Sequence, residues 1–219
     1  MPAPTDEDFV VLLGGALTAT PRLAADIAGA RVVAADGGMR HAAALGLTPE
    51  IWVGDFDSTP PALLDAWPDV ERQPYPAAKN ETDGAIAVSV AIERGARRIL
   101  LAGALGGERS DHALMHLLHA VSLEEQGLQV KLTSGEEEAW PLLPGTREID
   151  LPANSLFSVL GFTALSGLFI GNVRYPLADF PLPFGASRTI SNVAEGPIRL
   201  SLASGRAILI ARPYDLSGA

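Results

Sequence analysis

Residues 51–58 read Ile51-Trp52-Val53-Gly54-Asp55-Phe56-Asp57-Ser58, an apolar run that leads into two aspartates separated by one residue. The run is typical of the end of a buried strand. Because residues two apart in an extended segment point to the same side, we expect Asp55 and Asp57 to project together, with Phe56 turned the other way into packing. Two carboxylates at a strand end suit Mg²⁺, which usually takes one or two carboxylates and completes its shell with water and phosphates. Taken alone, the pair is also compatible with a solvated loop.

The same alternation of apolar run and polar turn recurs on both sides of this stretch. Further strands are predicted at residues 9–13, 31–35, 70–75, 98–102 and 128–132. Helices are predicted between them, from Thr20 to Gly29, up to Gly46, from Thr59, over 82–94 and over 110–126. Strands separated by helices of this length indicate a parallel α/β sheet.

The pattern changes near Pro141–Gly145, after which no helix is expected. Short β-type runs follow at residues 156–160, 168–173, 198–202 and 207–211, with Ala203–Arg206 as a hairpin connection. The acidic trio Glu136–Glu138 is interpreted as a solvated loop. The predicted fold is an N-terminal parallel-sheet α/β domain of Rossmann-like type, residues 1–143, followed by a smaller all-β sandwich domain, residues 144–219.

Composition narrows the class of protein further. The 219 residues carry a net charge of −10, which argues against general nucleic-acid binding but not against a nucleotide ligand. There is no apolar run of about 18 residues, so no membrane span is expected. The absence of cysteine excludes thiolate chemistry and, with an N-terminus unlike a signal peptide, leads us to expect a cytoplasmic protein.

Polar residues follow the predicted strands one after another. They are Asp36, Gly37 and Gly38 after the second strand, Asp55 and Asp57 after the third, Lys79, Thr82 and Asp83 before a helix, and Gly103–Gly107 with Arg109, Asp111 and His112 after the strand at 98–102. Each group alone could be a turn, a helix cap or a surface ion pair. Because ligands of open parallel sheets bind beyond the carboxyl ends of the strands, the recurrence favours one functional rim.

These residue types suit phosphate chemistry. Carboxylates gather Mg²⁺, Lys79 and Arg109 can neutralise phosphate oxygens, and glycines allow a polyphosphate close to the backbone. Phosphoryl-type transfer needs little beyond positioning and charge neutralisation. Neither GxxxxGK[ST] nor GxGxxG occurs, so the chain is neither an ordinary P-loop enzyme nor an ordinary dinucleotide-binding one.

In their order and spacing these motifs resemble those of the thiamine pyrophosphokinase family. The resemblance rests on Ala35-Asp36-Gly37-Gly38, Gly54-Asp55-Phe56-Asp57-Ser58, Lys79-x-x-Thr82-Asp83, and Gly106-Gly107 with Arg109-x-Asp111-His112. Gly167-Leu168, Arg174-Tyr175-Pro176-Leu177 and Ile190-Ser191-Asn192 look like the family's β-domain segments. Two positions depart from the family pattern. Glu108 is inserted before Arg109, and His116 stands where the family often has Asn.

The resemblance implies an enzyme that transfers the pyrophosphoryl group of ATP to the hydroxyl of thiamine, giving thiamine diphosphate and AMP. It implies the following roles: Mg²⁺ on Asp55, Asp57 and Asp83, with Asp111 as a further ligand or base; phosphates on Arg109 and Lys79, with Thr82 and His112 also at the substrate; Asp36 and Gly37 on the nucleotide or the acceptor hydroxyl; and Ser191 and Asn192 on the thiamine pyrimidine. It also implies a homodimer, with thiamine between the α/β domain of one subunit and the β domain of the other.

Two other functions remain open from the sequence. A pyrophosphokinase of similar fold could act on another hydroxymethyl heterocycle, such as a pterin, although the β-domain segments speak against it. A non-catalytic nucleotide or thiamine sensor is the alternative from a different class. The complete carboxylate set speaks against a sensor, because binding alone does not require a full metal site.

Overall fold

The computed structural model describes residues 5–57, 59–76 and 81–218. The chain forms two compact units. The first runs to His116 and includes Gly127–Gly135, whereas the second contains Leu117–Gln126 and everything from Glu136 onward. The last boundary between the units falls after Gly135, before the predicted domain boundary at 143/144. The assignment of separate functions to residues 1–143 and 144–219 stays a prediction. Within the described part of the chain, no helix is both long and apolar enough to cross a membrane.

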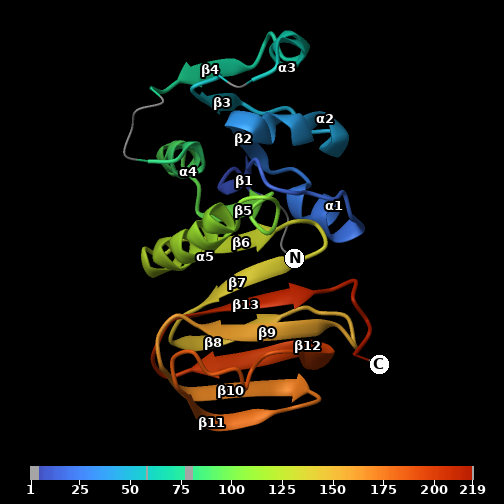
Figure 1. The fold of residues 1–219 in the computed structure, drawn as a ribbon, viewed down its shortest axis with the longest axis vertical. Coiled ribbons are helices and arrows are strands. Elements are labelled where there is room, and N and C mark those ends of the chain that lie inside the picture. Colours follow the sequence, from blue (N-terminus) through green and yellow to red (C-terminus); the bar gives the residue numbers. More distant parts are fainter. Residues whose placement is uncertain (1–4, 58, 77–80, 219) are drawn as a thin grey trace. The chain divides into compact units, whose positions relative to one another are not determined.

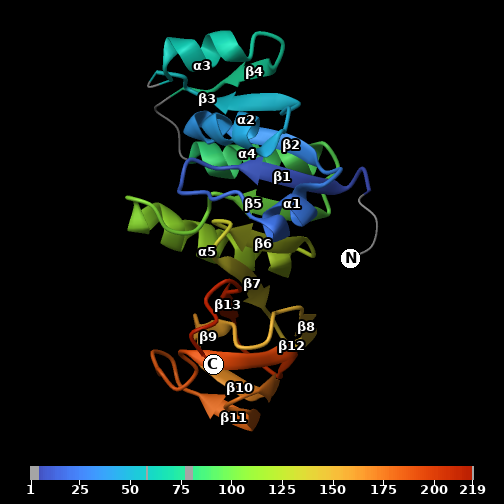
Figure 2. The same ribbon diagram turned by 90° about the vertical axis from the view of Figure 1, so that its right-hand side faces the viewer.

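The first unit is built on a parallel sheet. Its strands are β1 (Asp8–Leu12), β2 (Arg31–Ala35), β3 (Ile51–Gly54), β4 (Glu71–Pro74), β5 (Arg98–Ala102) and β6 (Gln129–Thr133). They lie in the order β4, β3, β2, β1, β5, β6, and every neighbouring pair is parallel (Figures 1 and 2). The strand order therefore reverses at β1, which lies between β2 and β5.

Helices connect these strands, as the sequence predicts. They are α1 (Pro21–Ile27), the 3₁₀ helix η1 (Asp36–His41), α2 (Ala42–Leu45), α3 (Pro61–Ala66), α4 (Asp83–Glu93) and α5 (Ser110–Glu125). Helix α1 begins as expected, because the hydroxyl of Thr20 accepts a hydrogen bond from the backbone N–H of Leu23 at 3.2 Å and proline occupies the first turn. Figure 1 shows α1 and α2 on one side of the sheet and α4 on the other. The sheet is thus covered on both faces, which explains why its strands are apolar throughout.

The second unit contains antiparallel strands. They are β7 (Glu138–Leu142), β8 (Gly145–Ile149), β9 (Leu156–Gly161), β10 (Leu165–Val173), β11 (Leu177–Leu182), β12 (Asn192–Leu202) and β13 (Ala207–Arg212). One layer pairs β7 with β13, β13 with β9, and β9 with the start of β12. The other pairs β8 and β10 with the rest of β12, and β11 with β10. Buried side chains of both layers, among them Leu209 and Leu200, form one core. The mixed α/β fold class is therefore confirmed.

Two expectations for this unit are wrong. Ala203–Arg206 does not close a hairpin, because it links β12 to β13, and β13 pairs with β7 and β9 instead. The acidic trio is not wholly a solvated loop, because Glu138 begins β7 and its side chain is only 1% exposed. In both cases pairing between distant strands overrides the local pattern.

Candidate functional site

A cleft of about 760 Å³ opens beyond the carboxyl ends of β1, β2, β3 and β5. It lies within the first unit and straddles the point where the strand order reverses, the place where open α/β sheets bind ligands. The predicted site residues that line it are Asp36, Gly37, Asp55, Thr82, Asp83, Arg109 and His112. Residues of four predicted clusters therefore share one cavity.

Bare backbone forms part of the cleft wall. The amide of Gly15, in the loop after β1, donates a 3.1 Å hydrogen bond to the carbonyl of Gly103, in the loop after β5. A Cβ atom on Gly15 would lie 2.3 Å from that carbonyl oxygen, so only glycine lets the two loops meet. This close approach brings the ends of β1 and β5 together at the reversal point.

Asp36 stands at the centre of a group of carboxylates. It is half-buried, its φ is 40°, and its Oδ1 atom has no hydrogen-bond partner within the described residues. Burial raises its pKa, against a backbone N–H of Gly37 that lowers it, and the negative charges of Asp83, Asp55 and Asp57 raise it further. A buried, unpartnered carboxylate oxygen among like charges is typical of a functional site.

Two residues of β3 hold Asp36 in this position. The indole N–H of Trp52 donates a 2.9 Å hydrogen bond to the Asp36 carbonyl oxygen. Gly54 lies so close that a Cβ atom there would come within 3.3 Å of the Asp36 Cβ. The end of β3 therefore sets the place of a side chain that belongs to the loop after β2.

The predicted geometry of Asp55 and Asp57 is wrong in one respect. Strand β3 ends at Gly54, and Phe56 takes a left-handed φ of 59°, so the two aspartates lie in a turn and alternation along a strand does not apply. The Oδ1 atom of Asp55 accepts a 3.2 Å hydrogen bond from the backbone N–H of Asp57. Asp55 lines the cleft, whereas Asp57 is exposed outside its lining but close enough to raise the pKa of Asp36.

The packing of Phe56 is confirmed. Its ring meets that of Trp52 edge to face, with 5.1 Å between the ring centroids. A left-handed backbone is costly for a bulky residue and persists only where surrounding contacts enforce it. The strain at Phe56 and at Asp36 thus falls within the predicted motifs.

The start of α4 forms another part of the wall. The hydroxyl of Thr82 caps the helix by accepting a 3.2 Å hydrogen bond from the backbone N–H of Ala85, and Asp83 lies in the first turn. Both residues line the cleft, as does Glu81. Lys79 lies outside the described residues, so its predicted contact with phosphates stays a prediction.

Arg109 and Asp111 form an ion pair with each other. Two guanidinium nitrogens of Arg109 donate to the two carboxylate oxygens of Asp111 at 2.9 and 2.8 Å, and both side chains are about two-thirds exposed. This pairing holds the pKa of Asp111 well below its usual range, which makes its carboxylate a poor base. Arg109 lines the cleft, whereas Asp111 lies outside the lining.

Arg40 and His41 were not predicted, although both lie in the helical turn that follows Asp36-Gly37-Gly38. Arg40 lines the cleft, and His41 places its Nε2 atom 3.0 Å from the Gly15 carbonyl oxygen. Burial lowers the pKa of His41. The position of these residues three and four places after Gly37, on the next turn of the helix, is the signal that would have suggested them.

Ser191 and Asn192 lie in the second unit, where the start of β12 meets β9. Ser191 is exposed, with a left-handed φ of 58°, and its backbone N–H donates to the hydroxyl of Ser158 at 3.0 Å. Asn192 is only 5% exposed, and its amide binds both the backbone N–H and the carbonyl of Tyr175, at 3.2 and 2.9 Å. Asn192 thus fixes the backbone next to Tyr175, and a contact of either residue with thiamine stays a prediction.

Metal binding at the predicted carboxylates fits the chemistry of the donors. Across residues 5–57, 59–76 and 81–218, no three His, Asp or Glu side chains converge closely enough to hold an ion by themselves. Mg²⁺ seldom needs such a cage, because one or two carboxylates and substrate phosphates complete its shell. The unpartnered Oδ1 of Asp36, beside three further aspartates, fits a cation that arrives with a phosphorylated ligand.

The fold and the cleft define a class, namely a doubly wound α/β domain with an acidic, glycine-lined ligand site, followed by an antiparallel β unit. Residues 28–132 match the family model described as the thiamin pyrophosphokinase catalytic domain. No protein of curated function matches the chain significantly.

Solved structures extend the likeness to nearly the whole chain. Thiamine pyrophosphokinase from Bacillus subtilis is 23% identical, with a TM-score of 0.81 over 94% of this chain and 99% of its own. The thiamin pyrophosphokinase from Geobacillus thermodenitrificans is 26% identical, with a TM-score of 0.78 over 94% and 98%. That from Candida albicans is 13% identical, with a TM-score of 0.80 over 95% and 89%. Residues 28–132 thus carry the catalytic domain of the thiamin pyrophosphokinase family, and the chain as a whole shares the fold of the solved structures.

Proposed function

We propose that the protein transfers the β,γ-pyrophosphoryl group of ATP to the hydroxyl of thiamine, giving thiamine diphosphate and AMP. The observation that carries this proposal is the convergence of Asp36, Asp55, Asp83 and Arg109 on one cleft at the strand-order reversal. The match of residues 28–132 to the family's catalytic domain supports the same reaction.

The nucleotide would occupy this cleft with its polyphosphate beside the glycine loops. Gly37 and Gly15 leave the backbone bare there, so phosphate oxygens can approach the main chain. Arg109, and Lys79 from outside the described residues, would neutralise the phosphates. Arg109 must then exchange Asp111 for a phosphate, a substitution of one bidentate acceptor for another. Thr82 and His112 would complete the substrate contacts.

Asp55, Asp57 and Asp83 would hold Mg²⁺, which, when bound together with ATP, would offset the charge of the phosphates. The carboxylates of this chain would otherwise repel the polyphosphate, because Asp36, Asp55 and Asp83 line the cleft with charge of the same sign. The acidic cleft therefore favours a nucleotide that brings its own cation.

In the transfer itself, the hydroxyl oxygen of the acceptor bonds to the β-phosphorus of ATP, and the bond from that phosphorus to the α,β-bridging oxygen breaks, so AMP leaves. The hydroxyl gives up its proton in the process. Asp36 is better suited than Asp111 to accept it, because burial raises the pKa of Asp36 while Arg109 lowers that of Asp111. Asp36 and Gly37 would thus face the reacting end of the acceptor.

The β unit of a second copy of the chain would complete the thiamine-binding site, through Ser191 and Asn192. The motive is the family resemblance together with the exposure of Ser191. Mixing an Asp57→Asn subunit with a Ser191→Ala, Asn192→Ala subunit tests it, because shared sites should regain activity that neither parent has. A fully active monomer by light scattering would contradict the homodimer.

The lack of cysteine fits a cytoplasmic enzyme, which imaging of a tagged chain would test.

Release of AMP from Mg²⁺·ATP separates the candidate functions. We expect AMP and thiamine diphosphate in equal amounts when thiamine is added, and little AMP without it. AMP release with a hydroxymethyl pterin but not with thiamine would favour the pterin-type enzyme. ATP or thiamine binding without any AMP would favour a sensor.

A further inference from the structure

Arg40 ties together two loops of the cleft. It lies in η1, after β2, and its guanidinium donates to the carbonyls of Gly14 and Gly15 in the loop after β1 and to that of Gly37 in its own helix. The bonds to Gly15 and Gly37 measure 3.1 and 3.3 Å. The side chain is exposed at the cleft surface, next to the strand-order reversal.

The charges around the cleft make Arg40 unusual. The charged groups that line the cleft are the carboxylates of Asp36, Asp55, Glu81, Asp83 and Glu108 and the guanidinium groups of Arg40 and Arg109. Arg109 is paired with Asp111, whereas the hydrogen bonds of Arg40 go to carbonyl oxygens, which carry no formal charge. Among the ion pairs of the described residues, none involves Arg40. Its positive charge is therefore available to an anionic ligand.

The geometry leaves Arg40 both fixed and accessible. The three bonds to carbonyls use Nη1 and Nη2, whereas a guanidinium has five N–H groups on three nitrogens. The residues to which it donates are glycines, and a Cβ atom on Gly37 would come within 3.3 Å of Nη1. The absence of side chains there leaves space for a phosphate beside the guanidinium.

We propose that Arg40 is a polyphosphate-binding residue of this cleft, held in place by the Gly14, Gly15 and Gly37 carbonyls. The inference rests on the proposed function only in taking a nucleoside triphosphate as the ligand. Arg40 would add a third positively charged side chain to Lys79 and Arg109, which the motifs assign to the phosphates. Unlike Arg109, it would not have to leave an ion-pair partner in order to bind them. Arg40 would also couple phosphate binding to the positions of the loops after β1 and β2.

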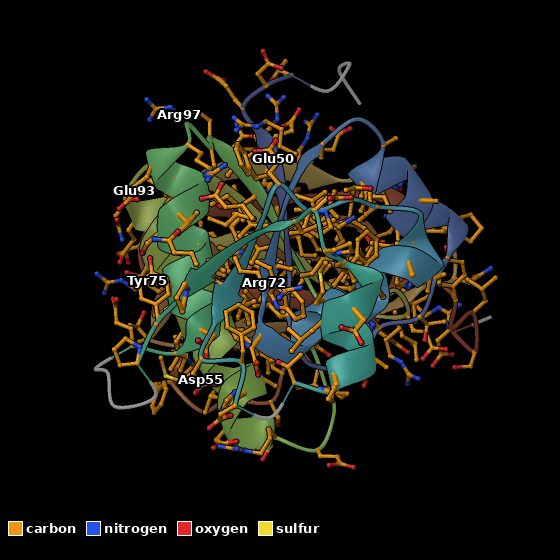
Figure 3. The ribbon with its side chains drawn as sticks, turned by 90° about the horizontal axis from the view of Figure 1, so that it is seen from above. Glu50, Asp55, Arg72, Tyr75, Glu93 and Arg97 are labelled. Carbon is orange, nitrogen blue, oxygen red and sulfur yellow. The ribbon has the colours of Figure 1, made fainter. Side chains whose placement is uncertain are left out.

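A purely structural role is the competing explanation, because a clamp on three carbonyls could serve only to shape the loops. Arg40→Gln separates the two roles, since its side-chain amide still donates to carbonyls but carries no charge. Arg40→Lys keeps the charge but loses the planar fork. Arg97→Gln is the matched control, because Arg97 is exposed at the opposite end of the sheet from Asp55 (Figure 3).

The experiment measures dissociation constants of Mg²⁺·ATP and of adenosine by calorimetry, in the full chain and without thiamine. For Arg40→Gln we expect ATP to bind about 10- to 100-fold more weakly, the loss typical of one charge-assisted contact, and adenosine within about twofold of wild type. Arg40→Lys should recover part of the loss, and Arg97→Gln should bind both ligands normally. The dependence of ATP affinity on salt should weaken in Arg40→Gln.

Equal losses of ATP and adenosine affinity in Arg40→Gln would overturn the assignment in favour of a clamp, as would unchanged ATP affinity. Should Arg40→Gln fail to fold, Arg40→Lys decides. A loss of ATP affinity with unchanged adenosine affinity would support the assignment, whereas equal losses of both, or no loss of ATP affinity, would overturn it. If ATP binding depends on Arg40 but the enzyme does not use thiamine as acceptor, the proposed function is wrong and the assignment of Arg40 stands. A wild-type chain that does not bind ATP would sink both.

Discussion

The two ends of the parallel sheet differ in how their charged side chains are arranged. At the amino ends of the strands, opposite charges pair: Arg31 lies 2.8 Å from Glu50, and Arg98 binds Asp8 through a 2.6 Å hydrogen bond. At the carboxyl ends, like charges gather around Asp36. Figure 3 shows the separation, with Asp55 at one end of the first unit and Glu50 at the other.

The pKa values record this difference. Hydrogen bonds from Arg98 and Arg31 lower the pKa of Asp8 and Glu50, whereas burial and neighbouring carboxylates raise that of Asp36. Paired charges at one end support the fold. The carboxylates gathered at the other end cost stability, because burial and like charges disfavour the ionised form of Asp36, and a cation with a phosphorylated ligand would offset that cost. Substitutions at the two ends should therefore affect different properties.

The largest expected effect is on turnover at the carboxyl end. Asp55→Asn and Asp57→Asn should each lower kcat about 100-fold or more, because an amide holds Mg²⁺ poorly. Folding should be little changed, since asparagine is nearly isosteric. Rates of AMP release at saturating Mg²⁺ and urea unfolding curves check both statements. Near-normal kcat in both variants would remove the aspartates from the metal site.

Arg109 sharpens the comparison, because it belongs to the cleft but is paired. Arg109→Ala should lower kcat about 10- to 100-fold, more than it raises KM for ATP, if the arginine turns to the transferred group. Arg109→Lys should be a partial rescue, because it lacks the fork. Glu108→Ala should be nearly neutral. Steady-state kinetics decide, and a harmless Arg109→Ala would mean that the inserted Glu108 has displaced the arginine from the reaction.

At the amino end, Asp8→Asn should cost about 1 kcal/mol of stability at pH 7 and leave kcat unchanged. The folded-state pKa of Asp8 is lowered, so its contribution is present above the unfolded value and is lost as the pH falls through the folded value. Wild type and variant should thus converge in acid. Urea unfolding between pH 7 and pH 2 measures this, and a gap that stays constant with pH would contradict the role of the ion pair.

Asp36→Asn should change stability by an amount similar to that of Asp8→Asn, but with the opposite sign. The folded-state pKa of Asp36 is raised, so its stabilising contribution exists below the unfolded value and is lost as the pH rises through the folded one. Removing the charge should raise Tm at pH 7 by roughly 2–4 °C, the shift that about 1 kcal/mol gives in a chain of this size. The difference should shrink toward pH 4. A variant less stable than wild type at pH 7 would show that the charge is compensated in the fold.

The sequence predicts the first unit well because its signals are local. Buried parallel strands such as β2 are continuous apolar runs, and Thr20 caps α1 through a bond within one helical turn. Strands β7, β8 and β11 were missed for physical reasons. Proline is unusual inside strands, yet Pro141 lies within β7 and Pro181 within β11, and β8 is mostly polar and exposed. Pairing with other strands, which the local pattern does not reveal, therefore decides these elements.

The candidate site was predictable in composition but not in geometry. The motifs correctly brought Asp36, Asp55 and Asp83 to one cleft, because parallel strands place their following loops on the same rim. They could not predict the left-handed turn at Phe56, which depends on packing against Trp52. Nor did they indicate Arg40, whose contacts with the loop after β1 join residues 25 and 26 positions apart.

Hydrogen exchange with and without Mg²⁺·ATP tests the difference between the two ends most directly. We predict slower exchange on ligand addition in the loops after β1, β2 and β5, at residues 14–16, 36–38 and 103–107. Amides at the amino ends of the strands, around Asp8 and Glu50, should be unaffected. Protection confined to those amino ends, or no protection in the three loops at saturating ATP, would contradict the placement of the nucleotide in the acidic cleft.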